Sequence, residues 1–378
     1  MNPETACIHA SRDTTHSTGA VCAPIYQSAT FAHLGVGRST GYDYSRLQNP
    51  TREQVERTLA ALEGGADAMA FATGMAATAC LMELFNPGDH LIASDDLYGG
   101  TVRLFDRVSA KNGVCVDYLD TNDLQALAAR ITPSTRAVFV ETPTNPMMHV
   151  TDIAAVKALL TGRDILLIVD NTFLTPYFCR PISLGADVVL HSGTKYLGGH
   201  NDTLAGFLVA AQAGLAEKLR FLYKTTGAVL SPFDSYLVLR GIKTLAIRMR
   251  QSQANAQAIA QWMLGQKKIR RVHYVGLPDH PGIAVSRRQA TGFGGMISFE
   301  TDAPETALRV LERVKLILFA ESLGGVETLI TYPAMQTHAD VPAERRETQG
   351  ITDRLLRLSV GIEAAEDLIA DLAQALED

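Results

Sequence analysis

The sequence predicts an α/β protein whose mostly parallel sheet is covered by helices on both faces, followed by a smaller α+β domain. Two observations carry this prediction: short runs rich in Val, Ile and Leu recur along the chain, and helical segments separate them. Continuous apolar runs are typical of strands buried on both faces, because the crossover helices of a parallel sheet cover both sides. At 378 residues, with 47% hydrophobic and 20% charged residues, the chain can form a full core and two domains.

The first fifty residues predict an arm with little core of its own, because Gly, Pro, Ser and Thr are frequent and periodic segments are few. Asn49 and Pro50 then supply a cap and a first turn for a helix that begins near Thr51 and extends to Leu62. Seven strands are expected at the apolar runs Ala68–Ala72, His90–Ala93, Val114–Tyr118, Ala137–Glu141, Ile165–Asp170, Asp187–His191 and Gly206–Ala210. Helices are expected between them, at Met75–Phe85, Gly100–Lys111, Thr121–Arg130, Asp152–Leu160 and Leu215–Tyr223.

A long helix is expected from near Ile242 toward Trp262, because Ala and Gln give this stretch a strong helix propensity. Beyond it the sequence predicts two strands, His273–Val275 and Gly294–Glu300, and two helices, Ala303–Val314 and Ala365–Leu376. The expected organisation is therefore an arm (1–50), a large domain (51–241) and a small C-terminal domain (242–378) of ordinary size.

Charge and composition exclude several classes of protein. A formal net charge of −6 without a basic block argues against a nucleic-acid-binding protein. The five cysteines are scattered without CxxC spacing, which is typical of reduced thiols, and no histidines have metal-ligand spacing. Neither a signal peptide nor a run of membrane-spanning length is evident. We therefore expect a soluble cytoplasmic protein that acts on a small molecule, without a metal, nucleic acid or a membrane.

Lys195 is the strongest candidate for a catalytic residue. It follows the apolar run 187–191, with Ser192 and Thr194 just before it, and Asp170 ends another apolar run upstream. A lysine that forms a Schiff base, hydroxyls that bind phosphate and a carboxylate that keeps a pyridine nitrogen protonated together suit pyridoxal 5'-phosphate (PLP). The alternatives are an ordinary surface lysine and an aspartate in a local turn with the two residues that follow it.

Further candidates lie at the carboxyl ends of the expected strands, where such sheets bind ligands. Thr73, Glu141, Asp170 and Lys195 all fall at or just after such ends. Gly74 opens a helix directly after a strand, and backbone N–H groups at a helix N-terminus bind phosphate. A plain strand-to-helix turn is the alternative for this segment.

Three more side chains have a functional and a structural interpretation. Arg46, beside Tyr44 in the arm, offers a bidentate fork for a phosphate, or belongs to a solvated turn. Tyr98 either stacks on a cofactor ring or fills the core. Arg357, inside an apolar strand-like run, either extends to solvent or binds a substrate carboxylate.

Taken together, these segments resemble the Cys/Met-metabolism PLP enzymes, the transsulfuration family of fold type I, over nearly the whole chain. The segments that carry the resemblance are 42–46, 49–52, 96–100, 141–146, 170–173, 192–200, 321–325 and 355–363.

The resemblance implies a role for each candidate residue. Lys195 would carry PLP and move protons, Asp170 would pair with the pyridine nitrogen, and Tyr98 would stack on the ring and assist catalysis. The phosphate would be held by Gly74, Met75, Ser192 and Thr194, with Tyr44 and Arg46 from a neighbouring subunit. The substrate would be positioned by Arg103, Asn145, Glu321, Ser322 and Arg357. Family members are typically tetramers built from such dimers, so a homotetramer is expected.

The segments 226–236 and 321–328 look most like those of cystathionine γ-synthases and O-acetylhomoserine thiol-lyases. This implies γ-replacement on an O-acylhomoserine with cysteine or sulfide, giving cystathionine or homocysteine. Glu321 is typical of γ-acting members but is shared by cystathionine γ-lyases, so a γ- or β-lyase that releases a 2-oxo acid from cystathionine or methionine is the alternative. A non-catalytic PLP-binding protein is a third one. Leu47 stands where some synthases that use succinylated homoserine carry a second arginine, which favours the O-acetyl ester.

Overall fold

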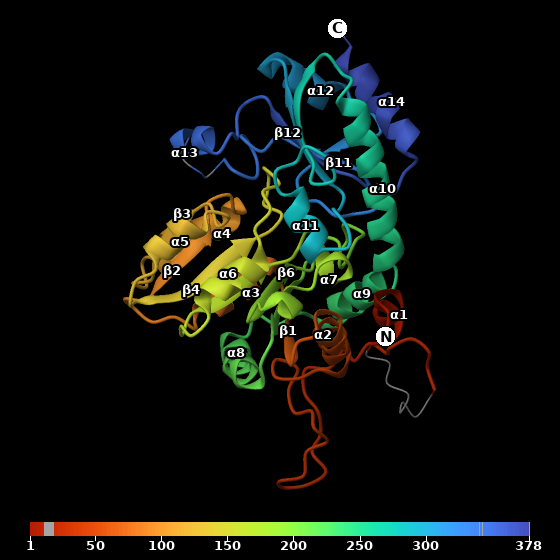
Figure 1. The fold of residues 1–378 in the computed structure, drawn as a ribbon. Coiled ribbons are helices and arrows are strands. Elements are labelled where there is room, and N and C mark those ends of the chain that lie inside the picture. Colours follow the sequence, from red (N-terminus) through yellow and green to blue (C-terminus); the bar gives the residue numbers. More distant parts are fainter. Residues whose placement is uncertain (11–18, 340, 342, 378) are drawn as a thin grey trace.

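The computed structural model describes residues 1–10, 19–339, 341 and 343–377, and its larger sheet contains seven strands (Figure 1). In spatial order the sheet is β1-β7-β6-β5-β4-β2-β3. Strands β6, β5, β4, β2 and β3 run parallel, whereas β7 is antiparallel to both of its neighbours. The strands are β1 (Asp67–Phe71), β2 (His90–Ser94), β3 (Cys115–Leu119), β4 (Thr135–Glu141), β5 (Leu166–Asp170), β6 (Val188–Ser192) and β7 (Gly206–Ala210). The predicted mostly parallel seven-stranded sheet is confirmed, and each expected strand overlaps an observed one.

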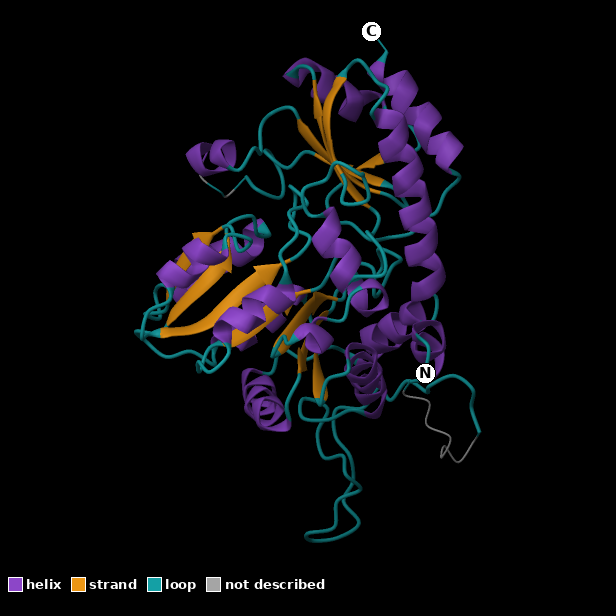
Figure 2. Cartoon of the chain, in the orientation of Figure 1, coloured by secondary structure: helices purple, strands orange, loops and turns teal. Residues whose placement is uncertain are grey.

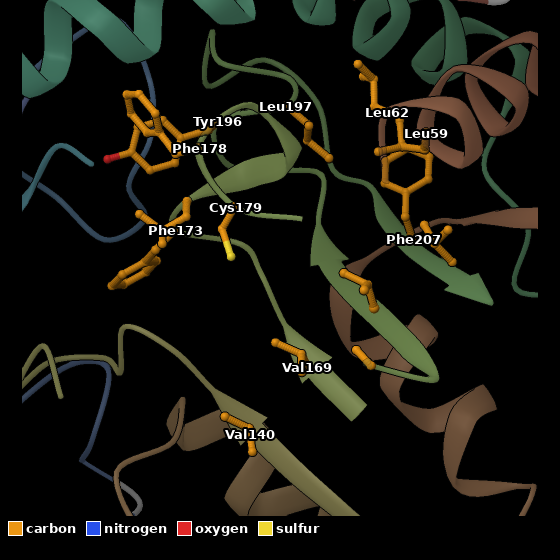
Figure 3. Close-up of a cluster of buried hydrophobic side chains, with 14 of the residues drawn as sticks. Leu59, Leu62, Val140, Val169, Phe173, Phe178, Cys179, Tyr196, Leu197 and Phe207 are labelled. Atoms are coloured by element: carbon orange, nitrogen blue, oxygen red, sulfur yellow. The ribbon is translucent and has the colours of Figure 1, made fainter. Parts of the chain in front are cut away.

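Helices cover both faces of this sheet, as the continuous apolar strands predict. They are α2 (Pro50–Glu63), α3 (Gly74–Met82), α4 (Gly99–Leu104), α5 (Leu124–Arg130), α6 (Ile153–Leu160), α7 (Thr175–Phe178) and α8 (Ala213–Thr226), with a π-helical turn η1 (Phe105–Ser109) and a 3₁₀ turn η2 (Pro181–Leu184). On one face Leu59 and Leu62 of α2 belong to the same buried cluster as Val169 and Phe207 (Figure 3). On the other face α3, α4 and α8 bury a second cluster around Phe71 and Phe139.

The second sheet has five strands in the order β10-β11-β12-β9-β8 (Figure 2). They are β8 (Ile269–His273), β9 (Met296–Thr301), β10 (Leu318–Phe319), β11 (Leu329–Thr331) and β12 (Leu355–Ser359). The remaining helices are α1 (Pro3–His9), α9 (Pro232–Ile242), α10 (Leu245–Met263), α11 (Ile283–Gln289), α12 (Pro304–Arg313), α13 (Ala343–Thr348) and α14 (Ala365–Leu376). α10 runs beside both sheets (Figure 1). The chain thus has the expected C-terminal α+β part, while the domain bounds 1–50, 51–241 and 242–378 stay a prediction.

Two expected elements differ from the structure. The long helix begins at Leu245 rather than near Ile242, because α9 ends at Ile242 and a short break at Lys243 and Thr244 separates the two helices. The strand expected at His273–Val275 lies earlier, as β8. Tyr274 and Val275 are buried from the turn after β8, and Tyr274 is held there by a 3.1 Å hydrogen bond from its hydroxyl to the carbonyl of Gly294.

Candidate active site

Lys195 lies in the short turn that follows β6, and its side chain is directed at the C-terminal part of the chain. Its Nζ donates a 2.8 Å hydrogen bond to Oγ of Ser322. Burial, together with the nearby guanidinium of Arg357, lowers the pKa of Lys195 to about 8, although Glu321 opposes this shift. Because only the neutral amine is a nucleophile or base, a lowered pKa is what a lysine with a chemical role requires.

Asp170 and Glu141 end the adjacent strands β5 and β4 and are paired in register. Burial raises the pKa of both carboxyl groups, and the charge of Asp170 raises that of Glu141 further. Oδ1 of Asp170 accepts hydrogen bonds from N and Oγ1 of Thr172, at 3.0 and 2.6 Å, so the local turn is present as well. Glu141 is buried and Asp170 is partly buried, and both carboxyl groups line the same pocket as Lys195, where a cation would stabilise their negative charge.

The N-terminus of α3 lies directly beside Ser192 in the wall of the pocket. Oγ1 of Thr73 caps the helix by accepting a 2.9 Å hydrogen bond from N of Ala76. The first N–H groups of a helix have no acceptor within it, which leaves those of Gly74 and Met75 for a ligand. A Cβ on Gly74 would lie 3.1 Å from Oγ of Ser192, so the glycine allows a close approach here.

Thr194 and the next strand complete this part of the pocket. Oγ1 of Thr194 donates to the carbonyl of Ala205 at 3.2 Å and accepts from N of Ala205 at 3.0 Å. These bonds hold the turn before Lys195 against the start of β7. The segment 192–195 is therefore fixed at both of its ends, by β6 and by β7.

Arg357 projects into the opposite side of the pocket from β12, and its side chain is only 1% exposed. Nη1 donates to Oδ1 of Asn145 at 2.9 Å, and Nη2 donates to the carbonyl of Ser322 at 2.9 Å and to Oγ1 of Thr331 at 3.1 Å. Nε is buried and has no hydrogen-bond partner among the residues that the structure describes. A buried guanidinium with a spare donor is suited to an anionic ligand such as a carboxylate.

Tyr98 lies at the rim, where its backbone N–H donates to Oε2 of Glu141 at 3.1 Å. Its ring is 41% exposed and packs over Gly100, where a Cβ would lie 2.5 Å from Cε1 of the ring. The structure thus contradicts the core-aromatic alternative. With its part open to solvent, the pocket has a volume of about 940 Å³.

The structure gathers most of the predicted site residues around one pocket. These are Gly74, Met75, Tyr98, Asn145, Asp170, Ser192, Thr194, Lys195, Glu321, Ser322 and Arg357. Tyr44, Arg46 and Arg103 do not line it: Tyr44 is 46% exposed in the arm, Arg46 donates through Nη1 to the carbonyl of Lys224 at 2.6 Å, and Arg103 is exposed on α4.

Sequence reasoning missed several residues that line the pocket, namely Thr78, Leu204 and Thr337. Thr78 could have been found, since it follows Gly74 by one helical turn and so shares its face. Leu204 and Thr337 lie in irregular segments without a periodic pattern, and no sequence signal indicated them. Among the described residues, no group of His, Cys, Asp or Glu side chains could hold a metal ion.

The fold of the chain is closely similar to those of solved PLP-dependent enzymes. Cystathionine gamma-lyase from Lactobacillus plantarum, solved in complex with L-serine, matches with a TM-score of 0.96 and 44% identity over 99% of this chain and 98% of its own. The chain therefore has the fold of the fold type I PLP-dependent enzymes. The model of the Cys/Met metabolism PLP-dependent enzymes matches residues 4–377, and the chain belongs to this family.

Curated relatives in the family differ in the reaction for which they are named. The cystathionine gamma-synthase/O-acetylhomoserine (thiol)-lyase of Bacillus subtilis is 52% identical over 95% of this chain and 92% of its own length. The cystathionine beta-lyase of Lactococcus lactis is 48% identical over 99% of this chain and 98% of its own. The comparisons thus establish a PLP-dependent transsulfuration enzyme and leave synthase and lyase both open.

The residues of the pocket fit PLP. The partly buried Asp170, with a raised pKa and a neighbouring carboxylate, is suited to a protonated pyridine nitrogen. The start of α3 and the hydroxyl of Ser192 provide donors for a phosphate where Gly74 leaves room. Lys195 is partly buried in the same pocket and has a lowered pKa, as attachment to an aldehyde requires.

Proposed function

We propose that the protein catalyses γ-replacement on O-acetylhomoserine, with cysteine or sulfide as the incoming thiol, and forms cystathionine or homocysteine. The observation that carries the proposal is a partly buried lysine of lowered pKa that lines one pocket with an arginine whose Nε is a spare donor. The relative from Bacillus subtilis is named for both of these reactions, which supports cysteine and sulfide as the incoming thiols. Glu321, typical of γ-acting members, lines the pocket beside Lys195.

On the cofactor side, Lys195 would be the attachment point and Asp170 would hold the pyridine nitrogen. When bound, PLP withdraws electrons from Cα of the amino acid and so makes its proton acidic. The side chains and backbone that would hold the phosphate are those of Gly74, Met75, Ser192 and Thr194. Tyr98, which lines the pocket, would stack on the ring.

On the substrate side, Arg357 binds the α-carboxylate through its spare Nε, and Asn145 keeps the guanidinium in place. Nζ of Lys195 removes the Cα proton, since a pKa of about 8 leaves roughly a tenth of the amine neutral at pH 7. The hydroxyl of Ser322, 2.8 Å from that nitrogen, orients it. Loss of a Cβ proton then supplies the electron pair that expels the γ-ester group as acetate, with Tyr98 assisting as an acid or base. The thiol loses its proton and adds at Cγ, and Cβ and Cα regain the protons that they lost.

Tyr44 and Arg46 complete the phosphate site of a neighbouring subunit, and the active form is a cytoplasmic homotetramer built from two such dimers. Both residues lie outside the pocket of their own chain, in an arm that extends away from the large sheet (Figure 1). Arg103, exposed on α4 outside the pocket lining, would interact with the distal end of a bound substrate. All five cysteines are free thiols, as expected for a reducing compartment, and no described helix is long and apolar enough to cross a membrane.

A cystathionine or methionine γ- or β-lyase that releases a 2-oxo acid is the second candidate. It is favoured by the relative from Lactococcus lactis, which is named for this type of reaction. The two activities share the removal of the Cα proton, so the pocket around Lys195 serves either of them.

The decisive experiment uses the enzyme with O-acetyl- and O-succinylhomoserine, each with and without cysteine or sulfide, and identifies the products by mass. We expect thioether formation from the acetyl ester with the higher kcat/KM, because Leu47 offers no cation to a distal carboxylate. A large preference for the succinyl ester overturns the choice of ester. Release of a 2-oxo acid from cystathionine that exceeds thioether formation favours the lyase.

A further inference from the structure

A buried polar cluster lies behind the cofactor pocket. Its members are Glu63, which is 1% exposed, His191, which is 0% exposed, and Asn171, which is 1% exposed. Side chains alternate along a strand, so His191 points to the opposite face of the sheet from its neighbours Leu190 and Ser192, which line the pocket. The cluster therefore contacts neither the substrate nor the cofactor.

One carboxylate oxygen connects the cluster. Oε1 of Glu63 accepts hydrogen bonds from Nε2 of His191 at 2.6 Å and from Nδ2 of Asn171 at 3.0 Å. Nδ2 of Asn171 also donates to the carbonyl of Cys179 at 2.8 Å. Oε2 of Glu63 and Nδ1 of His191 have no partner in the described part of the chain, so the shared oxygen is the centre of the network.

A carboxylate at position 63 destabilises the fold, and the packing of α2 against the sheet does not require it. It is the last residue of α2, and the C-terminal end of a helix disfavours negative charge. It is also buried, which destabilises a carboxylate unless donors surround it. The apolar Leu59 and Leu62 on the same helix already supply the packing against the sheet.

The two donors are the chain neighbours of cofactor-site residues. Asn171 directly follows Asp170, and His191 directly precedes Ser192. The strands that carry them, β5 and β6, are parallel neighbours, and N of Asn171 donates to the carbonyl of Leu190 at 3.0 Å. Burial raises the pKa of Asp170, and the hydrogen bonds from Thr172, together with the proximity of His191, oppose that shift.

We propose that Glu63 is a positioning residue of the cofactor site: by binding His191 and Asn171 through one oxygen, it fixes the carboxylate of Asp170 relative to the segment from Ser192 to Lys195. Glu63 acts through its two hydrogen-bond partners. Its removal is expected to change the position of Asp170 relative to the segment from Ser192 to Lys195, and so the affinity for PLP.

The test measures the dissociation constant of PLP from the apo-protein, by cofactor absorbance, together with the free energy of unfolding. Glu63→Ala is expected to raise the dissociation constant about tenfold or more, the effect seen when hydrogen-bond partners of metal ligands are removed. Glu63→Gln keeps an acceptor oxygen and should give an intermediate value.

Glu56→Ala is the matched control. Glu56 lies on the same face of α2, is also buried, and accepts from N of Ala70 at 3.0 Å and from Nη1 of Arg220 at 3.0 Å, away from the pocket. This variant should lose stability and keep the dissociation constant of PLP within about twofold, since distant sites act independently. If Glu63 had a purely structural role, the dissociation constant of PLP would change by the same factor in Glu63→Ala and Glu56→Ala.

The proposal is supported if Glu63→Ala weakens PLP binding clearly more than Glu56→Ala does. It is overturned if Glu63→Ala binds PLP as the wild type does, or if both variants weaken binding by the same factor. Should Glu63→Ala not fold, Glu63→Gln and His191→Gln replace it: both are expected to weaken binding, and unchanged dissociation constants in both overturn the proposal.

Discussion

Replacing Arg357 by lysine separates the binding of the substrate carboxylate from the other functions of the pocket. The guanidinium makes three hydrogen bonds to protein groups through Nη1 and Nη2, and its buried Nε has no partner in the described residues. Lysine keeps the positive charge but has a single nitrogen on a flexible chain. Arg357→Lys therefore loses the planar arrangement in which one donor is left for a ligand.

The size of the effect follows from the bonds lost. A hydrogen bond to a charged group contributes about 1.5–3 kcal/mol, and lysine retains the charge but not the bond that the spare Nε directs at the carboxylate. The expected loss is about 2 kcal/mol, which corresponds to a roughly 30-fold weaker binding of an amino acid.

The assay compares two unreactive ligands of the PLP-loaded enzyme, L-norleucine and pentylamine, which differ only in the carboxylate. Their dissociation constants are measured from the absorbance of the cofactor. Arg357→Lys should weaken norleucine binding roughly 30-fold and leave pentylamine within about twofold. Arg354→Lys, just before the same strand, is the control and should change neither constant; the Nη1 of Arg354 donates to the carbonyl of Asp302 at 3.1 Å.

Two results contradict the reasoning. If norleucine binds the variant as tightly as the wild type, Arg357 does not hold the carboxylate. If both ligands weaken equally, the substitution has distorted the pocket as a whole.

Three further predictions follow. Lys195→Ala should abolish turnover with every homoserine ester, and substantial residual activity would refute the role of Lys195. The rate at which apo-protein binds PLP should fall about tenfold per pH unit below the Lys195 pKa of about 8, because protonation removes the neutral amine; a flat profile in stopped-flow absorbance argues against this. Gly206→Ala should destabilise the protein by about 1–3 kcal/mol in urea unfolding, since its Cβ would lie 2.0 Å from the carbonyl oxygen of Thr73. Gly214→Ala, on the exposed face of α8 with nothing within 4 Å, should be neutral or stabilising, and equal destabilisation by both would contradict the argument.

The large sheet was predictable because its strands are continuous apolar runs, a signal that is local in the sequence. The cap at Asn49 was predictable for the same reason: its side chain binds N of Thr51 and N of Arg52, only a few residues away. The segment around Lys195 was found because hydroxyls and glycines flank it within one short stretch.

Features that depend on distant contacts were not predictable. Tyr274 and Val275 lie in a buried turn, and a buried turn has the same local apolar pattern as a buried strand. The spare donor of Arg357 depends on the positions of Asn145 and Thr331, which only the folded chain brings together. Likewise, no spacing in the sequence connects Glu63 to His191.

The hydrogen bond from Lys195 to Ser322 crosses the boundary between the two sheets. Under the proposed assignments, the residues that bind PLP lie in strands and turns before position 210. The residues that bind the amino-acid substrate lie mainly in and near the C-terminal sheet. Substitutions in the C-terminal sheet can therefore change which thioether or ester the enzyme binds as substrate, while the PLP-dependent chemistry is retained. Such a separation offers a physical reason why close relatives of nearly identical shape carry the names of different reactions.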